Sequence, residues 1–111
     1  MVLRDQIFRM HGFHVKSTVY SAKAIDEVLR DDYDLVLIDV EAEVRVKSAQ
    51  ELCDRIKKAI PGQHVAFVCN YRVGIESDCP DEVIRTEFNP EALVHGVQEA
   101  LDKNADKDRT L

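Results

Sequence analysis

Apolar residues recur along this chain with two different periods, one typical of β-strands and the other typical of amphipathic helices. Segments with the strand pattern are interspersed with segments that have the helix pattern. Four segments have the pattern of β-strands, because β-branched and aromatic residues either alternate with polar ones or run together. Two of them contain almost wholly apolar runs, Leu-Val-Leu-Ile at residues 35–38 and Val-Ala-Phe-Val-Cys at residues 65–69, which are typical of parallel strands buried on both faces. The predicted strands are residues 13–20, 33–40, 64–69 and 83–86.

Four other segments carry apolar residues three and four positions apart, which predicts amphipathic helices. Gly12 stands where the first of these helices should end, and Asn89 followed by Pro90 is a strong start for the last one. Ser48 and Glu51 have the spacing of a capping box, so the third helix is expected to begin there. The predicted helices are residues 3–11, 21–30, 48–60 and 89–101.

The order of these segments predicts a single α/β domain. Alternation of apolar strands with amphipathic helices is typical of a parallel sheet with right-handed crossovers, so we expect a doubly wound, three-layer sheet. Residues 70–82 show no clean period and are interpreted as a loop. The chain of 111 residues has room for one domain, at residues 1–101, followed by a polar tail at residues 102–111 that is expected to fray.

The charge of the chain disfavours two classes of partner. Lys and Arg number 15 against 21 Asp and Glu, which gives a formal net charge of −6. A negative chain repels phosphate backbones and anionic lipids, so neither a nucleic acid nor a membrane is expected as a partner. No apolar run approaches the roughly 20 residues of a spanning helix, and the N-terminus lacks the apolar stretch of a signal peptide. The expected location is the cytoplasm.

Three cysteines, Cys53, Cys69 and Cys79, form an odd set without Cys-x-x-Cys spacing. Such a set suits free thiols in a reducing compartment better than a disulfide framework. Cys69 ends a predicted strand and is either a reactive thiol or a buried, inert cysteine. The buried interpretation is favoured, because no cation is evident near it in the sequence.

The histidines do not form a convincing site. His11 and His14, with the distant Cys79, are the residues that could bind zinc, but a glycine separates the two histidines at a helix end. His64 and His95 have no nucleophile partner in the sequence and are expected at the surface. No cofactor is therefore expected.

Residues 33–39, Tyr-Asp-Leu-Val-Leu-Ile-Asp, resemble the third strand of a response-regulator receiver domain, the CheY-like family. In that family this strand ends in the aspartate that accepts a phosphoryl group, and the resemblance places this role at Asp39. The ordered resemblance runs from residue 3 to residue 101 and implies a flavodoxin/CheY-like fold and a part in two-component signal transduction. Its other matching segments are residues 4–15, 24–29, 51–61 and 86–93.

The departures from the family bear on function. A receiver begins with a strand that supplies two acidic ligands for Mg²⁺, and this sequence starts within the helix that follows, which leaves about four strands. Cys69 stands at the position of the phosphate-contacting Thr or Ser, and Thr86 stands at the position of the phosphate-pairing Lys. Asp39 and Glu41 are the acids left to bind Mg²⁺, which is expected only if Asp39 accepts phosphate. The span between Cys69 and Thr86 is short, so the fourth helix of the family is expected to be truncated or replaced.

A missing first strand would leave the strand at residues 13–20 separated from the strand at residues 33–40, because the first strand lies between them in a receiver. An open apolar edge is a liability that proteins cover. The two strands could pair directly, another chain could supply a strand, or a homodimer could close the gap. A fourth alternative is that the native protein begins earlier than Met1 and supplies the strand itself.

Three functions follow as hypotheses. The leading one is a degenerate receiver, or pseudo-receiver, that signals through protein–protein contacts without Mg²⁺-dependent phosphorylation and is not an enzyme. The second is a functional single-domain response regulator, phosphorylated on Asp39 by a histidine kinase in a phosphorelay. The third is a small thiol-dependent α/β protein that uses Cys69 or Cys79.

Overall fold

The computed structural model describes residues 2–19, 22–40, 42–76, 78–86 and 89–109. Helices and strands alternate along most of the chain, and the short connection after the first strand contains a single 3₁₀ turn. The elements are α1 (Val2–Met10), α2 (Ala22–Arg30), β1 (Val36–Val40), the 3₁₀ turn Glu43–Arg45, α3 (Val46–Ala59), β2 (Val65–Cys69), β3 (Glu82–Arg85) and α4 (Pro90–Arg109).

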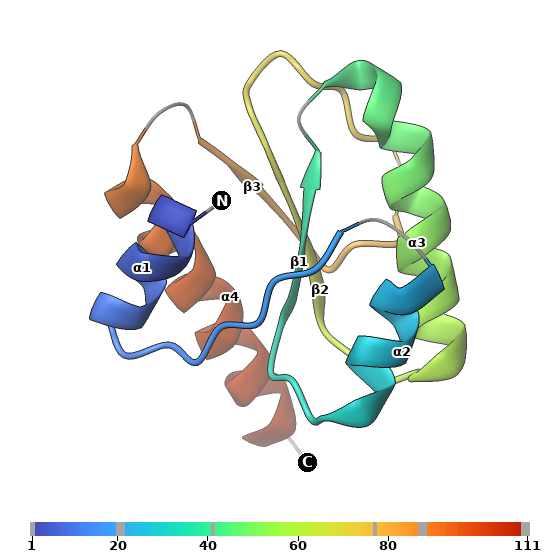
Figure 1. The fold of residues 1–111 in the computed structure, drawn as a ribbon, viewed down its shortest axis with the longest axis horizontal. Coiled ribbons are helices and arrows are strands. Elements are labelled where there is room, and N and C mark those ends of the chain that lie inside the picture. Colours follow the sequence, from blue (N-terminus) through green and yellow to red (C-terminus); the bar gives the residue numbers. More distant parts are fainter. Residues whose placement is uncertain (1, 20–21, 41, 77, 87–88, 110–111) are drawn as a thin grey trace.

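The strands that the structure describes form one three-stranded parallel sheet in the order β1-β2-β3. Helices α1 and α4 cover one face of the sheet, and α2 and α3 cover the other (Figure 1). The three-layer parallel α/β architecture predicted from the sequence is therefore confirmed. No helix in the described part of the chain is long and apolar enough to cross a membrane.

The core lies on both faces of β2, whose five residues are all buried. Side chains on one face join α2 and α3 in a cluster that includes Phe67 and Ile56. Side chains on the other face, among them Val68, join α1 and α4 in a second cluster. The continuous apolar run of this strand is thus explained by helices above and below it.

The predicted ends of two helices are confirmed in detail. After α1, Gly12 adopts a φ of +88°, and the amide of Phe13 donates to the carbonyl of Phe8 over 3.0 Å. This left-handed turn favours glycine, and the Phe8 and Phe13 rings meet edge to face across it with centroids 5.8 Å apart. At the start of α4, the Asn89 side chain accepts hydrogen bonds from the amides of residues 91 and 92. The far end of α4 differs from the prediction, because the backbone is helical through Arg109, where the sequence predicted a helix that ends at residue 101 and a fraying tail.

The predicted strand at residues 13–20 is wrong for its described part, residues 13–19, which form no ladder; residue 20 lies outside the described residues. The alternation has another cause. Phe13 and Val15 pack against the cluster beneath α1 and α4, while the residues between and after them are exposed. Alternation reports which side chains are buried, and an extended segment lying on a core produces the same pattern as a strand.

The start of the third helix is also earlier than predicted. The helix begins at Val46 with Arg45 as its N-cap, so the capping-box residues Ser48 and Glu51 lie exposed inside it. The 3₁₀ turn leads directly into the helix, and Val46 packs against the α2–α3 cluster. Burial of this valine favours the earlier start over the local cap signal.

The expectation of three free thiols is wrong. Cys53 of α3 and Cys79 of the loop before β3 form a disulfide, with their Cα atoms 6.3 Å apart, and Cys69 keeps its thiol and is buried. The chain between the two bonded cysteines runs through β2 and then returns beside α3. A pairing across 26 residues leaves no spacing signal in the sequence.

Candidate functional site

The residues that the resemblance singled out lie at the carboxyl edge of the sheet. Since the strands are parallel, β1, β2 and β3 all end at this edge, which brings Asp39, Cys69 and Thr86 to neighbouring strand ends. In register, Asp39 lies opposite Val68, and the amide of Thr86 donates to the carbonyl of Cys69 over 2.9 Å. The edge of a parallel sheet at the carboxyl ends of its strands is where open α/β folds bind their ligands.

Asp39 is bound by a cation from the N-terminal helix. The guanidinium of Arg4, on α1, donates to a carboxylate oxygen of Asp39 over 3.0 Å. Both side chains are about one-third exposed, at 32% for Arg4 and 30% for Asp39. Arg4 was not predicted as a site residue, because a contact between residues 35 positions apart has no local signal.

Cys69 faces a different layer from Asp39. Its side chain is buried in the cluster under α2 and α3, whereas Asp39 forms its ion pair with α1 on the other side of the sheet. At 3% exposure the Cys69 thiol is enclosed by apolar groups. The burial predicted for this cysteine is therefore confirmed, and its inertness stays a prediction.

A second arginine that the sequence analysis missed lies next to Thr86. The guanidinium of Arg85 donates to the backbone carbonyls of Asn70 and Val73, over 3.0 and 2.6 Å. Its charge thus fastens the segment that follows β2. Thr86 itself is half-buried at the end of β3 and has no charge to offer a phosphoryl group.

The candidate metal ligands considered from the sequence do not form a metal site among the residues that the structure describes. Glu41, the proposed companion of Asp39 for Mg²⁺, lies outside the described residues. No three His, Cys, Asp or Glu side chains of the described part of the chain come together in a way that could hold a metal ion. Cys79, proposed with His11 and His14 for zinc, is bonded to Cys53 instead.

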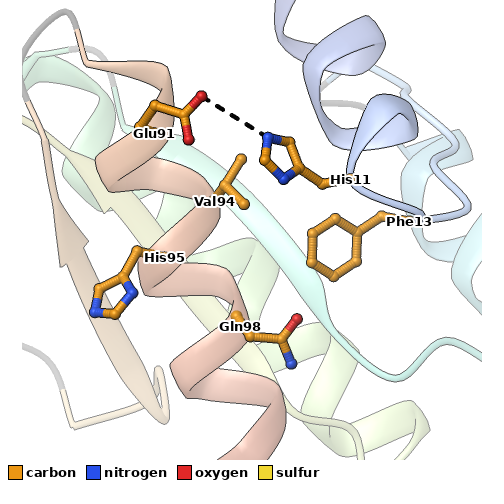
Figure 2. A pocket seen from close by; sticks show the side chains of 6 residues that line it. All are labelled: His11, Phe13, Glu91, Val94, His95 and Gln98. Atoms are coloured by element: carbon orange, nitrogen blue, oxygen red, sulfur yellow. Dashed lines mark ion pairs between the residues drawn. The ribbon is translucent and has the colours of Figure 1, made fainter.

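The described surface contains a shallow hollow of about 310 Å³ between the end of α1 and the first half of α4 (Figure 2). His11 and Glu91 face each other across its rim, with 3.8 Å between His11 Nε2 and Glu91 Oε1. His95 points away from the hollow and lies 2.9 Å from Glu99. The polar groups around the hollow therefore do not converge on one point, as they would in a built catalytic site.

The opposite, amino edge of the sheet carries a more enclosed polar cluster. One carboxylate oxygen of Asp81 accepts from Lys57 Nζ at 2.8 Å and from the amide of Val65 at 2.9 Å, and it lies 3.6 Å from His64 Nδ1. Burial by itself raises the pKa of Asp81. These three neighbours together lower the pKa by more than burial raises it, so the net pKa is below the ordinary value. His64 is buried rather than at the surface as expected. The cluster ties the end of α3 to the starts of β2 and β3.

Of the comparisons with known proteins, the comparison with solved structures finds a match, and it agrees with this architecture. The chain matches no protein-family model, and it matches no curated protein sequence. Among solved structures it is similar to the crystal structure of a response regulator receiver domain protein (CheY-like) from Methanospirillum hungatei JF-1. The likeness covers 96% of this chain and 87% of that one, with a TM-score of 0.77 and 21% sequence identity.

The fold is accordingly that of a CheY-like receiver domain with a shortened sheet. The resemblance predicted from the sequence is confirmed at this level, and an identity of 21% establishes the fold alone. In the described residues between β2 and β3 there is no helix, as the short span had predicted.

Proposed function

We propose that this protein is a pseudo-receiver: a non-enzymatic signalling domain that acts through protein–protein contacts, without Mg²⁺-dependent phosphorylation of Asp39. The observation that carries the proposal is the ion pair between Arg4 and Asp39. This ion pair binds Asp39, the acid to which the sequence resemblance assigns the phosphoacceptor role, to a cation from the same chain.

The chemistry of phosphoryl transfer explains why this matters. Transfer to a carboxylate depends on a correctly positioned nucleophile and on cations that neutralise the phosphoryl oxygens. Arg4 donates to a carboxylate oxygen of Asp39. Its positive charge therefore neutralises the nucleophile and does not neutralise an incoming phosphoryl group. The second arginine at this edge, Arg85, is engaged with backbone carbonyls.

The partner in this proposal is a protein, either another signalling protein or a second copy of this chain. Within the described residues β1 pairs only with β2, which supports a contact along the outer edge of β1. The cytoplasmic location predicted from the sequence remains a prediction.

The test is intact-mass measurement after incubation with Mg²⁺ and acetyl phosphate. We expect no phosphoryl adduct on the wild-type protein and none on Asp39→Asn. An adduct on the wild type that is absent from Asp39→Asn overturns the proposal and identifies a working phosphoacceptor, for which a histidine kinase should then be sought.

A second pair of variants tests the role assigned to Arg4. Arg4→Gln removes the cation beside Asp39, and Arg55→Gln removes an exposed arginine on α3 as a matched control. If Arg4 blocks the carboxylate, only Arg4→Gln gains a slow adduct. Adduct formation of equal extent on both variants and on the wild type would show that the ion pair does not protect Asp39.

A further inference from the structure

The segment between β2 and β3 is bonded covalently to α3 at one point. Cys79, near the end of the segment, is joined to Cys53, which lies in the middle of α3 and is fully buried. The two Cα atoms are 6.3 Å apart, inside the range of roughly 4.4–6.8 Å that a disulfide spans without backbone movement. The same positions can therefore hold two thiols or one disulfide with little change in the helix.

Non-covalent contacts hold the two ends of this segment. At its start, Arg85 binds the carbonyls of Asn70 and Val73, and the Val73 side chain is buried. At its end, Asp81 is held by Lys57 and by the amide of Val65. These contacts are present whatever the oxidation state of the cysteines, so the disulfide is an additional restraint on the part of the segment between them.

The restrained part carries an exposed surface. Gly74, Glu76 and Asp78 are all exposed. In Figure 1 the segment leaves the carboxyl end of β2, close to the candidate site, and descends beside α3 before β3 begins. A change in how firmly it is held therefore changes a surface that a partner protein can reach.

We propose that Cys53 and Cys79 form a redox latch, in which oxidation fastens the chain around Cys79 onto α3 and reduction releases it. The disulfide lowers the number of conformations open to the segment, because it closes a covalent loop. With the two thiols reduced, Arg85 and Asp81 still hold the ends of the segment and Ile75 still packs against the core, while the chain around Cys79 opens more readily. The latch does not depend on whether Asp39 accepts phosphate.

The reaction is a thiol–disulfide exchange with a small-molecule disulfide such as oxidised glutathione. The thiolate of Cys79, the half-buried member of the pair, attacks one sulfur of glutathione disulfide and releases one glutathione thiolate. Cys53, as its thiolate, then attacks the mixed disulfide and releases the second glutathione. The two protein thiols lose two protons and two electrons, and glutathione disulfide takes them up as two glutathione molecules.

The first experiment counts thiols. The folded protein is equilibrated with an excess of reduced or of oxidised glutathione, then unfolded, alkylated with N-ethylmaleimide and weighed. We expect three adducts after reduced glutathione and one, on Cys69, after oxidised glutathione. One adduct in both buffers would mean a permanent structural disulfide, three in both would mean that no disulfide forms, and either result overturns the latch.

The second experiment measures the consequence by hydrogen exchange of the same two samples. We expect the amides of Glu76, Asp78 and Cys79 to exchange about tenfold faster in the reduced protein, since local opening no longer works against a covalent restraint. Amides of β2 should be unchanged. Cys79→Ser, which changes a half-buried residue, should show the fast rate in both buffers. Equal exchange of the two wild-type forms at Glu76, Asp78 and Cys79 overturns the proposal.

Discussion

Two aspartates at opposite edges of the sheet are each bound by a cation, and their surroundings differ. Asp39 meets Arg4 in a position where both side chains are about one-third exposed, so water screens the pair and its effect on stability is small. Asp81 is 22% exposed and accepts from a lysine and from a backbone amide on the same oxygen. A carboxylate with two charge-assisted bonds and less water contributes more to folding.

Asp81 is the residue where we expect a pH-dependent contribution to stability. Its pKa is lowered in the folded protein, because its hydrogen-bond partners and the nearby Lys57 and His64 outweigh its burial. The contribution is complete above the ordinary aspartate pKa of about 3.9, and it is lost as the pH falls through the lower folded pKa. Asp81→Asn should therefore cost about 1–2 kcal/mol near neutral pH and progressively less in acid.

The test is urea unfolding of wild type and Asp81→Asn from neutral pH down to below the ordinary aspartate pKa. It measures the difference between the two proteins in the free energy of unfolding at each pH. Asp78→Asn, an exposed aspartate in the same loop, is the control and should leave the free energy of unfolding nearly unchanged. A gap between wild type and Asp81→Asn that stays constant from neutral pH down into the acid range would contradict the assigned role.

At the scale of elements, α4 lies unusually close to the last strand. Gly96 occupies the middle of α4, where glycine costs about 1 kcal/mol relative to alanine in an ordinary helix. A methyl group at residue 96 would lie 2.6 Å from Cγ2 of Ile84 on β3, which is too close for two carbons. The glycine therefore lets the helix approach the sheet.

The substitution Gly96→Ala should destabilise the protein in spite of its better helix propensity. The clash involves a methyl group branched at Cβ, which cannot swing away as the end of a long side chain does. We expect a net loss of about 1–2 kcal/mol in the free energy of unfolding, measured by chemical denaturation. Gly62→Ala, where a Cβ would meet nothing within 4 Å, is the matched control. A Gly96→Ala protein more stable than wild type would mean that β3 and α4 can move apart at no cost.

At the scale of the whole molecule, β2 lies at the centre of both apolar clusters. Its alternate residues face the two helix layers, and residues of β1 also pack into both clusters. Phe67 is among the largest fully buried side chains and lies in the cluster under α2 and α3. The two halves of the core therefore meet at the sheet, with β2 as its central strand.

Phe67→Ala should weaken the entire fold. Removing a fully buried phenyl ring costs about 3–5 kcal/mol, by lost transfer energy and by the cavity left behind, against a typical total stability of about 5–15 kcal/mol. We expect a large fall in the urea midpoint with one cooperative transition. Tyr71→Ala, at a 68% exposed position, should change the midpoint little. A transition that splits in two would show that the helix layers fold separately.

The sequence by itself determined the features that depend on neighbouring residues. Gly12 ends α1 because only a residue tolerant of positive φ closes that turn easily, and Asn89 starts α4 because its side chain reaches amides two and three positions ahead. The apolar run in β2 required cover on both faces, which is enough to predict a parallel sheet between helix layers. These signals are local, so no knowledge of the whole fold is needed to interpret them.

The tertiary structure decided what depends on segments that meet only after folding. Residues 13–19 alternate as a strand does, but they pair with no strand of the sheet. Their alternation arises because Phe13 and Val15 pack against the cluster beneath α1 and α4. Likewise the Cys53–Cys79 bond and the pairing of Arg4 with Asp39 join residues 26 and 35 positions apart. Whether such groups meet is set by the crossover path of the chain and the register of its strands, and composition and periodicity do not encode that path residue by residue.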